Sequence, residues 1–164
     1  MMKFQNIGFF CAILAGSLCL ATPVLGYEIS SYAGVNDNGT LRIKGRTIRL
    51  FGIHIPETTR TCSQNRIPRI CGSRASVALE FKIDGFVSCA LLERHMDNTY
   101  TGQCRVNVSA FDEGDDLSAY LLQKGWAVAL PDAPFEYHTL EKIARSRSFG
   151  VWGMPVDNVI DRRR

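Results

Sequence analysis

Residues 29–53 read ISSYAGVNDNGTLRIKGRTIRLFGI, and this stretch has the clearest pattern of short strands in the chain. Three of its segments have the composition of β-strands: Ile29–Val35, Thr40–Lys44 and Thr47–Ile53. Asn36–Gly39 separates the first two, and Asn-Gly between strand-like runs favours a hairpin turn whose two central residues have positive φ. Gly45-Arg46 supplies a second turn. The stretch therefore predicts a three-stranded meander.

The remainder of the chain supplies the other elements of a small barrel. Helices are expected from Ser73 to about Ile83, from Asp115 or Asp116 to Lys124, and from Phe135 to Phe149. Two further strands are expected at Phe86–Glu93 and Gln103–Phe111, joined by the polar stretch Arg94–Gly102. Five strands with a helix after the third fit an oligonucleotide/oligosaccharide-binding (OB) barrel. The predicted fold is thus α+β, mainly β: a five-stranded OB-fold barrel with three helices.

The first 26 residues have the pattern of a secretory signal peptide. Lys3 precedes an apolar run, Ile7–Leu20, which is too short to span a membrane comfortably, and small residues precede an expected cleavage near Gly26. We expect residues 27–164 to form one domain, which is exported to the periplasm or secreted. The composition of the whole chain is 46% hydrophobic and 21% charged, which excludes a disordered protein. Its net charge of +3 is too small to indicate nucleic-acid binding by itself.

Four cysteines lie beyond the expected signal peptide: Cys62, Cys71, Cys89 and Cys104. An even number of cysteines in an exported chain predicts disulfides, and four cysteines allow three pairings. Cys62 and Cys71 bracket a loop, whereas Cys89 and Cys104 lie in apolar stretches that could form neighbouring strands. We expect Cys62–Cys71 and Cys89–Cys104. Zinc binding is the alternative, although the chain contains no Cys-x-x-Cys pair.

The sequence resembles the thermonuclease (staphylococcal nuclease-like) family, in its exported bacterial form with disulfides. The resemblance is collinear and rests on these segments: Asp37–Leu41, Ile48–Glu57, Cys71-Gly72, Tyr100–Gln103, Asp116–Ser118, Gly125–Ala127, Glu141–Arg145 and Gly150–Trp152. It implies metal-assisted phosphodiester hydrolysis, with a calcium ion held by two aspartates. It further implies a glutamate that activates or orders water and two arginines that bind the phosphate.

Two of these five positions match the family and three depart from it. Arg49 matches the first arginine and Glu57 the glutamate. The resemblance places Gly39 and His54 where the family has its two metal-binding aspartates. It places Gln103 where the second arginine belongs.

Other roles are open for several of these residues. Arg105 would share a strand face with Gln103 and is a candidate substitute for the missing arginine. Arg49 could instead form a structural ion pair with Glu57. His54 could bind a transition metal or act as a base, or it could be a packed or surface histidine.

Loss of both aspartates removes two negative charges and their oxygen ligands from a site for a hard dication. Calcium-dependent cleavage is therefore not expected, and no cofactor is predicted. The leading hypothesis is a monomeric pseudoenzyme that binds a nucleic acid, a nucleotide or a protein partner in the old active-site groove. One alternative is an active nuclease for DNA or RNA with altered metal use. It would employ His54, Glu57 and Arg49, with Arg105 as a further candidate. Another is a structural module of the cell envelope without a groove function.

Overall fold

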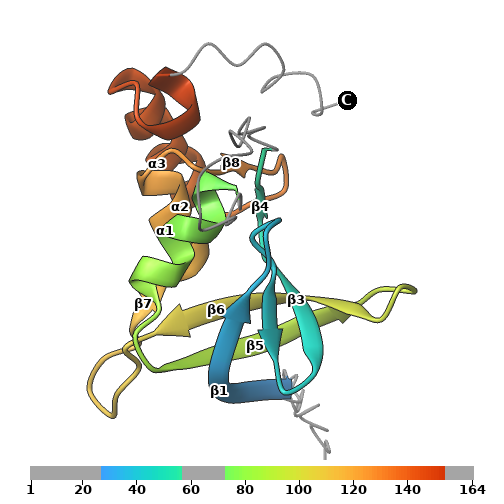
Figure 1. Ribbon diagram of the computed structural model, residues 1–164. Helices are drawn as coiled ribbons and strands as arrows, with labels where there is room; N and C mark the ends of the chain where they lie inside the picture. Colours follow the sequence, from blue (N-terminus) through green and yellow to red (C-terminus); the bar gives the residue numbers. More distant parts are fainter. Residues whose placement is uncertain (1–26, 57–72, 154–164) are drawn as a thin grey trace, which may run out of the picture.

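The computed structural model describes residues 27–56 and 73–153 (Figure 1). Three sequence predictions fall outside these residues: the signal peptide at residues 1–26, the role of Glu57, and the Cys62–Cys71 disulfide. Within the described part of the chain, no helix is long and apolar enough to cross a membrane.

The strands form a closed five-stranded barrel, as the sequence predicted. Its strands are β1 (Tyr27–Val35), β2 (Leu41–Ile43), β3 (Arg46–Leu50), β5 (Phe86–Arg94) and β6 (Thr99–Val106). The first three form the antiparallel meander, and β5 pairs antiparallel with both β1 and β6. A parallel pairing of β3 with β6 closes the barrel. This order of strands is that of an OB-fold.

The two turns of the meander differ from each other in backbone conformation. In the first turn, Gly39 N donates to Asn36 O at 2.8 Å, and positive φ occurs at Gly39 (+78°) but not at Asn38. The expectation of two positive φ values was therefore wrong here, because a three-residue loop needs only its last residue in the left-handed region. The second turn of the meander lies one residue earlier than the predicted Gly45-Arg46. Lys44 and Gly45 form this two-residue turn, with φ values of 46° and 77°, and Arg46 begins β3.

Three helices lie together on one side of the barrel (Figure 1). They are α1 (Arg74–Lys82), α2 (Leu117–Gln123) and α3 (Phe135–Ser146), and the short 3₁₀ helix η1 (Gly150–Gly153) follows them. Ser73 and Asp116 cap α1 and α2 by accepting hydrogen bonds from backbone N–H groups of the first turn. The third helix ends three residues before the predicted Phe149, because Ser148 has a φ of 54°.

Two short pairings join the helical layer to the barrel. The strand β4 (Ile53–His54) pairs antiparallel with β8 (Val128–Ala129), and β7 (Asp115–Asp116) pairs with the end of β6. The predicted third strand, which ran to Ile53, is interrupted because Gly52 has a φ of 72°. Consequently β3 ends at Leu50, and His54 belongs to a separate sheet beside the barrel.

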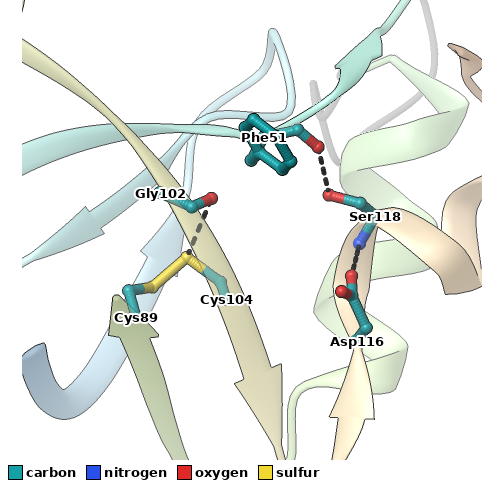
Figure 2. The surroundings of a disulfide bond; sticks show 6 residues. All are labelled: Phe51, Cys89, Gly102, Cys104, Asp116 and Ser118. Atoms are coloured by element: carbon teal, nitrogen blue, oxygen red, sulfur yellow. Dashed lines mark hydrogen bonds between the residues drawn. A yellow bond between two sulfur atoms is a disulfide. The ribbon is translucent and has the colours of Figure 1, made fainter. Parts of the chain in front are cut away.

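The core fills the barrel and the space beneath the helices. Side chains such as Leu41, Ile48 and Leu121 are fully buried. The disulfide Cys89–Cys104 joins residues that lie directly opposite each other on β5 and β6, and both cysteines are fully buried (Figure 2). This predicted pairing is confirmed.

The strand expected at Gln103–Phe111 lies at Thr99–Val106 instead. Its turn is formed by His95–Asn98: His95 N donates to Thr99 O at 2.8 Å, and Asn98 has a φ of 59°. Polar residues on the outward face of the first half of β6 made this segment resemble a linker. Both Thr99 and Thr101 are nevertheless β-branched residues, which suit a half-exposed strand.

Candidate functional site

A groove of about 660 Å³ lies on the side of the barrel. Its walls come from the β1–β2 turn, the end of β3, β4, the β5–β6 hairpin and the segment after β8. The charged and titratable groups along it are Arg49, Glu93, Asp132 and the imidazoles of His54 and His95. Apolar side chains, among them Ile53, Ile55 and Leu130, form much of the remaining surface. This size falls in the range of small-molecule pockets, about 300–1,000 Å³.

Arg49 is the arginine of the groove, and an aspartate holds it there. Its Nη2 donates to Oδ2 of Asp97 at 2.9 Å, and both side chains are about half exposed (54% and 52%). Hydrogen bonds from the Thr99 side chain and backbone, aided by the charge of Arg49, lower the pKa of Asp97 below its usual value. An exposed pair of this kind contributes little stability. The half-exposed guanidinium remains accessible from the groove.

The groove residue contributed by β6 is Thr101. It lies opposite Arg49 in the parallel register of β3 and β6, and it lines the groove. Gln103 and Arg105 are not among the groove residues. The Nε2 of Gln103 donates to Oδ2 of Asp116 at 2.9 Å.

Arg105 is paired elsewhere on the outer face of β6. Its Nη1 donates to Oε2 of Glu113 at 2.6 Å, and this hydrogen bond raises the pKa of the guanidinium. Of the predicted site residues that the structure describes, Arg49 and His54 are the two that the fold brings together in the groove. Arg105 and Gln103 are held by acidic partners outside it.

His95 is a groove residue that the sequence interpretation missed. It begins the tight turn between β5 and β6, and its Nε2 lies 2.7 Å from Oγ1 of Thr101. His54 reaches the groove from β4, so two imidazoles that are distant in the sequence line one hollow. A correct placement of the hairpin at residues 95–98 would have indicated His95, because it would put this histidine at the end of β5. Nowhere in residues 27–56 and 73–153 do three or more histidine, cysteine or acidic side chains gather as metal ligands would.

Gly39 lies at the edge of this region, in a position that leaves no room for a side chain. A Cβ built on Gly39 would overlap Cδ1 of Ile55, and the residue has a φ of +78°. An aspartate here would have to adopt the left-handed conformation and displace Ile55. The backbone conformation of this turn and the packing of Ile55 against it therefore both favour glycine at position 39.

Phe51, one of the groove residues, is tied to the helical layer through Ser118 and Asp116 by hydrogen bonds (Figure 2). Ser118 Oγ donates to Phe51 O at 2.9 Å, and the Ser118 backbone N donates to Oδ1 of Asp116 at 2.8 Å. Tyr137 Oη donates to the other oxygen of the same carboxylate at 2.7 Å. Burial, and then this hydrogen bond, raise the pKa of Tyr137 well above its ordinary value. Phe51 is thereby fixed between the barrel and α2.

No protein-family model matches this chain, and a search of curated proteins found no match either. What the fold establishes is therefore the class: an α+β protein with a closed OB-type barrel, three helices and a lateral groove.

Proposed function

We propose that the protein is an exported thermonuclease-like domain that has lost calcium-dependent phosphodiester hydrolysis and acts by binding a ligand or partner in the groove. The observation that carries this proposal is the environment of Gly39. Where the resemblance calls for a metal-binding aspartate, the turn has a glycine in the left-handed region with Ile55 packed against it.

The other replaced metal position supports the same conclusion. His54 presents an imidazole to the groove, and neutral nitrogen is a poor ligand for calcium, which prefers hard anionic oxygens. The two acids that line the groove, Glu93 and Asp132, come from β5 and from the segment after β8. Neither belongs to a cluster of three candidate ligands among the described residues.

Loss of the second arginine would weaken transition-state stabilisation further. Thr101 stands opposite Arg49, and its hydroxyl provides no positive charge for a phosphoryl group. Removal of one donor aimed at developing charge costs about 10²–10³ in rate in well-studied enzymes. Among the described lining residues, one arginine stands beside two acids, and this charge balance favours holding a ligand over stabilising a doubly charged phosphorane.

The groove retains the features of a binding site. It is concave, has a mixed polar and apolar lining, and contains an arginine side chain that is half exposed. A nucleotide is a suitable first probe because it combines an anionic group for Arg49 with a planar base for the apolar wall.

The decisive experiment is a nuclease assay on disulfide-intact protein with DNA and RNA across a panel of divalent metals. We expect no cleavage with calcium. Cleavage with calcium that stops in the Glu57→Gln variant would refute the proposal. Cleavage with manganese or zinc that falls in His54→Ala would instead favour the alternative of a nuclease with altered metal use.

Binding is tested separately by an NMR titration with a nucleotide or a short oligonucleotide. We expect saturable shifts at Arg49, His54 and Thr101, and a loss of affinity in Arg49→Gln. Arg42→Gln is the matched control, since Arg42 is an exposed arginine on the neighbouring strand β2 and does not line the groove. Equal affinity in the two variants would contradict a role for the groove.

A further inference from the structure

A second hollow, of about 380 Å³, lies on the other side of the end of β5. Its lining brings together two arginines, Arg46 and Arg94, and two tyrosines, Tyr27 and Tyr100. It shares Leu92 and Glu93 with the groove, so the end of β5 separates the two hollows. None of the predicted site residues within residues 27–56 and 73–153 lines this second hollow.

The register of the barrel explains why these side chains meet. Arg94 lies opposite Tyr100 across β5 and β6, and Tyr27 lies opposite Leu91 across β1 and β5. Arg46 begins β3, next to the residue that pairs with the start of β6. The cluster thus draws on four strands of a rigid barrel, which is a better support for a site than a loop.

The tyrosine rings hold the two guanidinium groups in position. The Cζ of Arg46 lies 5.4 Å from the ring centroid of Tyr27 and 5.9 Å from that of Tyr100. The Cζ of Arg94 is also 5.9 Å from the centroid of Tyr100. Cation–π contacts at these distances orient a guanidinium without using its N–H donors.

Most of those donors remain available. Arg94 donates one hydrogen bond, from Nη2 to Oδ1 of Asn98 at 2.7 Å. Arg46 has no hydrogen bond or ion pair from its side chain to any residue in the described ranges. By contrast, Arg49 and Arg105 each donate to a carboxylate, that of Asp97 and that of Glu113. Because each guanidinium carries five donors, this hollow presents a concentrated set of unused ones.

We propose that this hollow is a binding site for a small anion, one that carries a phosphate or carboxylate group on an apolar or aromatic body. The guanidinium planes match the paired oxygens of such a group. Leu91, Leu92 and the exposed ring of Tyr27 provide the surface for the body of the ligand. Glu93 is the acid among the described lining residues, so the two positive charges exceed the negative charge. The site does not depend on the function proposed for the groove.

The test is an NMR titration of the disulfide-intact protein with phenyl phosphate, benzoate and inorganic phosphate. We expect saturable shifts at Tyr27, Arg46 and Tyr100, and tighter binding of the two aromatic anions than of inorganic phosphate. The better of the two aromatic probes identifies the preferred anionic group. No saturable shift up to about 10 mM ligand, or shifts confined to Arg49 and His54 in the groove, would overturn the proposal.

Variants distinguish a specific site from general attraction of anions. We expect Arg46→Gln to weaken binding of the best probe about tenfold, the effect of losing one charge-assisted interaction. Glu93→Gln should tighten binding about twofold to fivefold, because it removes a nearby negative charge. Arg42→Gln lowers the net charge equally outside the hollow and should leave affinity unchanged. Equal weakening by Arg42→Gln and Arg46→Gln would reduce the site to nonspecific charge attraction and refute the proposal.

Discussion

Replacement of Asp116 by alanine is expected to produce a large loss of stability for a single polar residue in this fold. Its carboxylate accepts four hydrogen bonds. Oδ1 accepts from the backbone N–H groups of Ser118 (2.8 Å) and Ala119 (3.2 Å). Oδ2 accepts from Gln103 Nε2 (2.9 Å) and from Tyr137 Oη (2.7 Å). One side chain therefore caps α2 and joins that helix to both β6 and α3.

The expected magnitude follows from these contacts. Loss of an N-terminal cap costs about 1 kcal/mol. Tyr137 is only 3% exposed, and loss of the hydrogen bond from its buried hydroxyl to this carboxylate costs a further ~1–3 kcal/mol. We therefore expect Asp116→Ala to lower the free energy of unfolding by roughly 2–4 kcal/mol. Asp116→Asn should cost less, because it retains an oxygen for the cap.

The measurement is urea-induced unfolding of the disulfide-intact protein, followed by circular dichroism. Asp112→Ala is a suitable control because Asp112 belongs to the same acidic segment, is exposed, and accepts one local hydrogen bond, from Gly114 N at 2.8 Å. We expect this control to cost less than about 1 kcal/mol. If the two alanine variants lose equal stability, the reasoning about Asp116 as a junction between layers is wrong.

Three further predictions concern stability. Removing the Cys89–Cys104 disulfide in a double alanine variant should cost about 3 kcal/mol of unfolding free energy, given its sequence separation of 15 residues, and chemical denaturation of the variant would measure this. The pKa of Tyr137 is raised in the folded state, so above about pH 10 the folded protein retains a proton that the unfolded chain loses. The free energy of unfolding should therefore fall as the pH rises above about 10. This decline should be smaller in the Tyr137→Phe variant. Gly45→Ala and Gly125→Ala both place alanine at positive φ. A Cβ on Gly125 would overlap the Phe149 carbonyl, whereas Gly45 has open space around it. In a thermal melt, Gly45→Ala should lower the free energy of unfolding by about 1 kcal/mol and Gly125→Ala by clearly more.

Local sequence signals predicted the parts of this fold that short-range interactions determine. The Asn-Gly turn, the cap of α1 by Ser73 and the cap of α2 by Asp116 each involve residues within four positions of one another. The start of β6 was misplaced because its threonines alternate with residues that face the barrel, a pattern that polarity alone does not reveal. The break between β3 and β4 depends on the backbone of Gly52, next to the ring of Tyr137, which lies far away in the sequence.

The groove could be predicted only in part, because strands that are distant in the sequence must pair to form it. The parallel pairing of β3 with β6 places Thr101, not Gln103, beside Arg49. Since residues 101 and 103 share one face of a strand, alternation cannot choose between them; only the register between distant strands can. This shift of two residues leaves the expected loss of calcium-dependent cleavage unchanged. Neither threonine nor glutamine carries a charge, and Arg105 is paired with Glu113 on the outer face of β6. Whichever residue is matched to the missing arginine, β6 brings no second cation to the groove, and calcium-dependent hydrolysis is disfavoured under either alignment.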